Sequence, residues 1–71
     1  MNIVNTVLHW IDPKDYLPRN NSTILFVNKN YEICEGEFHK KDNSWLQYRW
    51  SAKLNFDEVL YWTDKIYINR D

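Results

Sequence analysis

The sequence contains one glycine, Gly36, one cysteine, Cys34, and two prolines, and each shortage excludes a class of protein. A single glycine cannot build the glycine-rich loops that hold nucleotide phosphates. A single cysteine cannot form an internal disulfide, which argues against a secreted, disulfide-stapled scaffold and favours the reducing cytosol. We therefore expect a cytoplasmic protein without a phosphate-binding loop.

Long apolar runs are also missing. No stretch approaches the roughly 20 apolar residues that a membrane-spanning helix needs. The first residues lack the charged start and apolar core of a secretory signal. Both observations predict that the protein works in the cytoplasm of its cell, with no membrane as partner.

Neither sign of charge dominates the chain. Nine basic and ten acidic residues give a net charge of −1. A general nucleic-acid binder would carry a basic field, and a DNA mimic would be strongly acidic. The composition therefore favours neither class.

The length of 71 residues allows a single domain, residues 1–71. So short a chain buries only roughly 60% of its unfolded surface, and small scaffolds often gain stability by association. We therefore expect a homodimer or a tightly held partner.

Aromatic residues make up 17% of the sequence. They serve either as a compact core or as a surface on which bases or sugars stack.

The hydrophobic pattern predicts a mainly β protein. A continuous apolar run at residues 24–27 indicates a central strand, with further strands at 31–38, 45–50 and 59–62. Weaker strand signals occupy residues 3–10 and 66–68. Asp12 and Pro13 indicate a one-turn helix near residues 12–16. The expected fold is a small antiparallel meander of four to five strands, either an open sheet or an SH3-like barrel.

Three local features carry more specific predictions. Gly36 within a strand predicts a bulge or a close approach of another backbone. Asn55 and Glu58 resemble a helix capping box, but the β-branched and aromatic residues from Val59 onward favour a strand. The alternation at 45–50 predicts a half-buried strand with an apolar, buried face of Leu46, Tyr48 and Trp50 and an opposite face of Trp45, Gln47 and Arg49.

Residues that carry chemistry are sparse. His9, Cys34 and His39 are the only nitrogen or sulfur ligands for a metal, and their spacing matches no zinc motif. Cys34 and His39 fall on opposite faces of a strand, which also argues against a nucleophile–base pair. Glu35 and Glu37 share a face at about 6–7 Å, but so short a chain lacks the cleft that a glycosidase needs. We expect no enzyme activity, no cofactor and no metal.

Basic and aromatic residues alternate between residues 40 and 53. Such a segment suits a protein interface, where Trp, Tyr and Arg dominate the binding energy, or a single strand of nucleic acid. A third interpretation is structural, with Trp45 covering a small core and the lysines solvating a loop. The candidate partner-binding residues are Trp45, Gln47 and Arg49, with Lys40 and Lys41 steering the encounter.

The order of short motifs resembles a family of small phage and prophage proteins, domain of unknown function 551. The matching elements are Trp10-Ile11, Leu17-Pro18, the strand at 24–27, Gly36 with Phe38, Trp45, and Val59 with Trp62. They cover roughly residues 10–62. The chain departs from the family after Trp62, where Thr63-Asp64-Lys65-Ile66 replaces the usual proline-containing tail.

The resemblance implies a small β-sheet fold and a phage or prophage origin, without catalytic residues. Together with the composition it predicts a binding protein that occupies the surface of a host protein or complex, for example one that serves in defence, and so inhibits or modulates it. Two alternatives stay open: a nucleic-acid or nucleotide binding module that uses the aromatic and basic residues, and a small structural or assembly protein.

Overall fold

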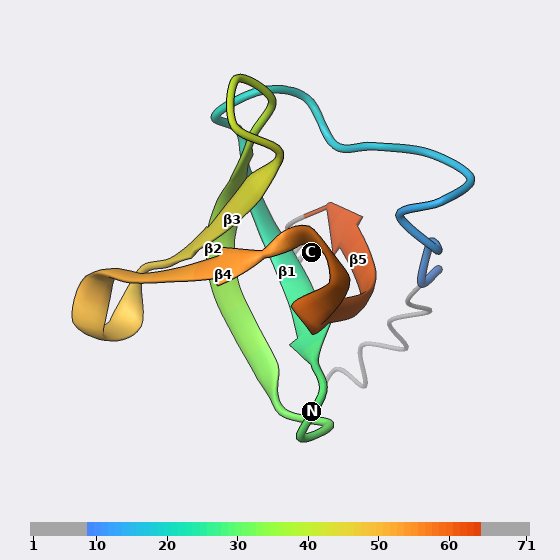
Figure 1. Ribbon diagram of the computed structural model, residues 1–71. Helices are drawn as coiled ribbons and strands as arrows, with labels where there is room; N and C mark the ends of the chain where they lie inside the picture. The colour runs from blue at the N-terminus through green and yellow to red at the C-terminus, as the bar shows by residue number, and fades with distance from the viewer. Residues whose placement is uncertain (1–8, 65–71) are drawn as a thin grey trace, which may run out of the picture.

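Five antiparallel strands form one twisted sheet in the computed structural model, which describes residues 9–64 (Figure 1). The strands are β1 (Thr23–Asn28), β2 (Ile33–His39), β3 (Ser44–Gln47), β4 (Ala52–Asn55) and β5 (Val59–Asp64). Two short 3-10 helices, η1 (Arg49–Ser51) and η2 (Phe56–Glu58), lie on either side of β4. The strand signal at 66–68 and residues 3–8 of the signal at 3–10 fall outside the described residues, and His9 and Trp10, which are described, are not in a strand.

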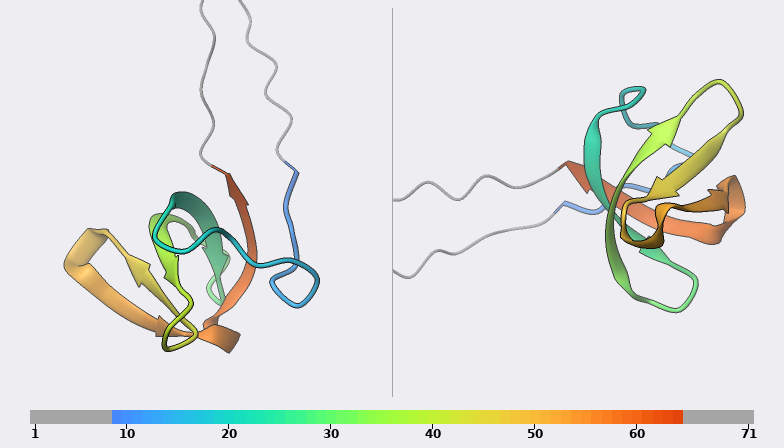
Figure 2. Two further views of the ribbon diagram at one scale, coloured as in Figure 1. Left: turned by 90° about the horizontal axis from the view of Figure 1, so that it is seen from above. Right: turned by 90° about the vertical axis from the view of Figure 1, so that its left-hand side faces the viewer.

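The strand order across the sheet is β4-β3-β2-β1-β5. The first four strands form a meander, and β5 returns to pair with β1 on its other side. The mainly β, antiparallel prediction is confirmed, and of the two architectures the open sheet is observed. Figures 1 and 2 show the β3–β4 hairpin diverging from the β1–β2 hairpin, so that η1 and the β1–β2 turn are separate loops.

The central position of β1 follows from its sequence. Ile24 and Phe26 are fully buried, while Leu25 and Val27 on the opposite face are half-buried. A strand with apolar residues on both faces is stable only where neighbours flank it on both sides. The prediction of a central strand at 24–27 is therefore confirmed.

Aromatic rings fill the core on one face of the sheet. The buried apolar residues are Ile24, Phe26, Cys34, Phe38, Trp45, Val59 and Trp62. The ring centroids of Phe38 and Trp45 lie 4.7 Å apart, and the indole N–H of Trp45 donates to the Phe56 carbonyl at 3.1 Å. The expected faces of residues 45–50 are therefore wrong: Trp45 is fully buried, and Trp50, placed on the buried face, is 79% exposed.

The backbone of Gly36 in β2 lies close against the backbone of β3 and the ring of Phe26. A Cβ atom at this position would overlap the carbonyl oxygen of Leu46 and lie 2.8 Å from the ring of Phe26. The close approach expected from a glycine within a strand is confirmed, because only a residue without a side chain fits here.

The segment before β1 is fastened to β5. The Asp12 carboxylate accepts the Lys14 amide at 2.9 Å, and its carbonyl accepts the Tyr16 amide at 3.2 Å. Residues 12–16 therefore form a hydrogen-bonded turn in place of the expected one-turn helix. The Trp62 indole donates to the Tyr16 carbonyl at 2.8 Å, and Ile11 exchanges two backbone hydrogen bonds with Trp62.

No helix within residues 9–64 is long and apolar enough to cross a membrane.

The ambiguity over residues 55–62 is resolved in favour of a strand. Asn55 and Glu58 do contact each other, with Nδ2 and Oε1 3.4 Å apart, but the Asn55 side chain caps no backbone amide. The helical signal corresponds only to the three residues of η2, after which β5 begins at Val59.

Candidate functional site

The turn between β3 and β4 holds an exposed tryptophan in an unfavourable backbone conformation. Trp50 has φ 66° and Ser51 has φ 46°, in the left-handed region that glycine and asparagine usually occupy. For a bulky residue such a conformation costs on the order of 1–3 kcal/mol and persists where the surroundings fix it. Trp50 gains no burial in return, since 79% of its surface is exposed. The indole therefore adds little to the hydrophobic core.

Arg49 lies against this indole. Its guanidinium carbon lies 4.6 Å from the centre of the Trp50 ring, which is a cation–π contact. The turn itself is closed by the hydrogen bond from the Ser51 amide to the Tyr48 carbonyl at 3.1 Å. The tip of the hairpin therefore presents one ordered aromatic ring and one positive charge together.

A groove of about 520 Å³ separates this tip from the start of β2. Its volume falls in the range of roughly 300–1,000 Å³ that is usual for ligand pockets. The walls, which we call the β2 notch, are formed by Ile33, Cys34 and Glu35 on one side and by Tyr48, Arg49 and Trp50 on the other.

Apolar and acidic groups share the β2 notch. Ile33 is 63% exposed, and Glu32 and Glu35 line the same groove, with the Glu32 carboxylate accepting a hydrogen bond from the Asn28 side chain at 3.2 Å. Burial, reinforced by the negative charge of Glu32, raises the pKa of the Cys34 thiol above its ordinary value. The thiol therefore stays protonated at neutral pH, and the charges of the notch are two carboxylates and the Arg49 guanidinium.

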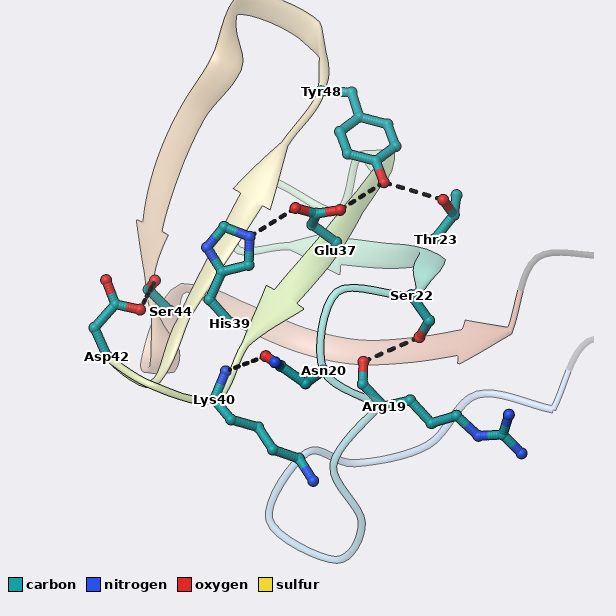
Figure 3. A network of polar contacts seen from close by, with 10 residues as sticks. All are labelled: Arg19, Asn20, Ser22, Thr23, Glu37, His39, Lys40, Asp42, Ser44 and Tyr48. Atoms are coloured by element: carbon teal, nitrogen blue, oxygen red, sulfur yellow. Dashed lines mark hydrogen bonds and ion pairs between the residues drawn. The ribbon is translucent and has the colours of Figure 1, made fainter.

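A polar network on the outer face of the sheet holds the base of the turn (Figure 3). The Tyr48 hydroxyl donates to a Glu37 oxygen at 3.0 Å and lies 3.0 Å from the Thr23 hydroxyl. The other Glu37 oxygen lies 2.7 Å from Nε2 of His39. These contacts join β1 and β2 to the residue that precedes Arg49. They lower the pKa of Glu37, chiefly through the hydrogen bond from His39 and then through that from Tyr48.

The predicted patch between residues 40 and 53 is divided by the fold. Gln47 and Arg49 do line the β2 notch. Lys40 and Lys41 lie in the β2–β3 loop, at the opposite end of β3, where the Lys40 amide donates to the Asn20 side chain at 2.9 Å (Figure 3). The expectation that Trp45 faces a partner is wrong, because its side chain is fully buried in the core.

Trp50 and Ile33 are the residues that sequence reasoning missed. The apolar alternation of residues 45–50 assigned Trp50 to the apolar face, and residues 48–51 lack the glycine, asparagine and proline that mark turns most strongly. Across residues 9–64, no group of three or more His, Cys, Asp or Glu side chains is placed to hold a metal ion.

No family model matches the chain, and neither does any curated protein or any solved structure. The resemblance to domain of unknown function 551 therefore stays a prediction from the sequence, and the function is argued from the geometry of the site.

Proposed function

We propose that this protein is a non-enzymatic binding protein that attaches to the surface of another protein through the β2 notch and the Trp50 ring. The observation that carries the proposal is the exposed indole of Trp50, which lies against Arg49 on a turn with left-handed backbone. Tryptophan, tyrosine and arginine supply most of the binding energy in protein interfaces. A ring that is already ordered also loses little entropy on binding.

The resemblance of the sequence to phage and prophage proteins supports a phage origin. On that basis the partner is a host protein or complex, for example one that serves in defence. Binding would inhibit or modulate it by covering a surface that it needs for its own contacts.

The nucleic-acid alternative is less well supported by the arrangement of charges. It relied on Lys40 and Lys41 acting together with the aromatic residues, and they lie at the other end of β3. Glu32 and Glu35 line the same groove as Trp50 and would repel phosphates there.

The test is capture of partners from host-cell lysate by the tagged protein, with and without nuclease, followed by mass spectrometry. We expect one stoichiometric protein that survives nuclease and that Trp50→Ala loses by tenfold or more, about 1.4 kcal/mol. Tyr16→Ala is the matched control, because Tyr16 is an equally exposed aromatic residue, at 73%, on a different segment. Loss of all captured material after nuclease would instead support the nucleic-acid alternative, and self-association far beyond a dimer in sedimentation would support an assembly role.

A further inference from the structure

The β2 notch contains a free strand edge. β2 pairs with β1 from Ile33 to Glu37 but with β3 only from Gly36 to His39. One more hydrogen bond, from the Tyr48 amide to the Glu35 carbonyl at 3.0 Å, ends the contact before the chain turns away into η1. The first residues of β2 are therefore flanked by a strand on one side and by the notch on the other.

The backbone groups of Ile33 point into this notch. In an antiparallel pair, successive residues direct their N–H and C=O groups alternately to the two sides of the strand. The Glu32 carbonyl accepts the Asn28 amide at 3.1 Å, which assigns Glu32 to the β1 side, whereas Glu35 bonds toward Tyr48. Ile33 lies two residues before Glu35 and shares its side. Within the described part of the chain, no strand lies opposite Ile33 there.

The side chains around this edge specify what would suit it. Ile33 and Trp50, exposed by 63% and 79%, offer apolar contact on either side of the groove. The charged residues that line the groove are Glu32, Glu35 and Arg49. Each already has a contact within the chain: Glu32 accepts a hydrogen bond from the Asn28 side chain at 3.2 Å, Arg49 lies against the Trp50 ring, and Glu35 also has a partner. The groove thus carries a net negative charge beside its apolar surface, which complements a positively charged side chain.

We propose that the β2 notch binds an extended segment of the partner protein as an added β-strand, paired with the backbone of Ile33 and carrying a lysine or arginine next to an apolar residue. Strand addition to an exposed edge takes its affinity from main-chain hydrogen bonds and its specificity from alternate side chains. This inference rests on the proposed function and names the chemistry of the partner. It explains why the hairpin tip with Trp50 stands apart from β2 and does not continue the ladder.

The experiment is an NMR titration of the isotopically labelled full chain with a probe peptide, acetyl-Ser-Val-Lys-Val-Lys-Val-Ser-amide. We expect saturable shifts of the Ile33 amide and the Trp50 indole, and slower hydrogen exchange at Ile33. A second peptide with glutamate in place of both lysines should bind about tenfold more weakly or worse. A third, with the lysine peptide N-methylated at alternate backbone amides, should not bind, because it keeps the side chains but loses the strand-forming donors.

Ile33→Pro gives the same test from the protein side, with Ile33→Val as its matched control. Proline removes the backbone amide of Ile33, which donates to no other residue of the described chain. The valine control should therefore bind the lysine peptide, and the proline variant should not. If the proline variant fails to fold, the N-methylated peptide still decides the question.

Equal binding of the N-methylated or the glutamate peptide, or no saturable shift at Ile33, would overturn strand addition. So would a concentration-dependent shift of the Ile33 amide in the free protein, which would place a second copy at this edge. These results are distinct from failure of the proposed function. A host protein that is captured in a Trp50-dependent manner while the peptides leave Ile33 unchanged would retain the binding function and reject the strand.

Discussion

The hydroxyl of Tyr48 lies 3.0 Å from Oε2 of Glu37 and donates a hydrogen bond to it. The same hydroxyl is 3.0 Å from Oγ1 of Thr23, so a single phenol links two strands to the base of the turn that carries Arg49 and Trp50. Tyr48 thereby connects the stability of the sheet to the geometry of the candidate binding site.

Tyr48→Phe tests this connection. The variant keeps the ring and removes the hydroxyl, so we expect a loss of about 0.5–1.5 kcal/mol in the free energy of unfolding, measured by urea denaturation. Capture of the partner should also weaken, because the turn is less firmly held. Tyr16→Phe is the control, since Tyr16 is an exposed tyrosine whose hydroxyl bonds to no described residue. Equal stability of the two variants would show that the contacts of the Tyr48 hydroxyl contribute nothing to the fold.

The two tryptophans of the β3–β4 hairpin should behave in opposite ways. Trp45→Ala empties the centre of the aromatic core and should cost about 3–5 kcal/mol, enough to unfold so small a domain. Trp50→Gly removes an exposed side chain from a left-handed position, so stability should stay the same or rise by up to about 1 kcal/mol. Partner capture should nevertheless be lost. Urea midpoints and capture from lysate, measured on the same preparations, separate the two effects.

Those two residues also mark the limit of what the sequence predicts. The central strand, the close approach at Gly36 and the strand from Val59 were predicted because each depends on a local pattern of residue types. The burial of Trp45 depends on its pairing with Phe38 across β2 and β3, and the turn at residues 48–51 lacks glycine, asparagine and proline. Trp50 and Ser51 adopt left-handed backbone conformations in which glycine or asparagine would be expected.

The β2 notch could not be predicted for a related reason. It exists because β3 stops after four residues while β2 has seven, so one end of β2 loses its neighbour. Pattern and propensity predict that strands exist far better than they predict where strands end. The return of β5 to the side of β1 is likewise a long-range pairing, which no local pattern encodes.

Gly36→Ala should be among the most damaging small substitutions in this chain. The added methyl group would meet the Leu46 carbonyl, which is backbone and cannot turn aside, and the buried ring of Phe26. We expect a loss of roughly 1–3 kcal/mol or more, from overpacking and from displacement of β3. Thermal unfolding followed by circular dichroism measures this loss. Ile33→Ala, an exposed change in the same strand, should cost much less; similar costs for both would mean that β2 and β3 are not in close contact.

The stability of the fold should decrease in acid through Glu37. Its pKa in the folded protein lies below the ordinary value, so the folded state holds the proton less readily than the unfolded state. The stabilisation from its hydrogen bonds is therefore complete above the unfolded pKa and is lost as pH falls through the folded pKa. His39→Asn should move the titration of Glu37 to higher pH, and Tyr48→Phe should move it by less, since the bond from His39 is the larger cause. Carboxyl NMR of the side chain between pH 2 and pH 6, a range set around the roughly 4.3 of an unperturbed glutamate, follows both changes. A larger shift in Tyr48→Phe than in His39→Asn would reverse the order of the two contacts and make the phenol the main anchor of this carboxylate.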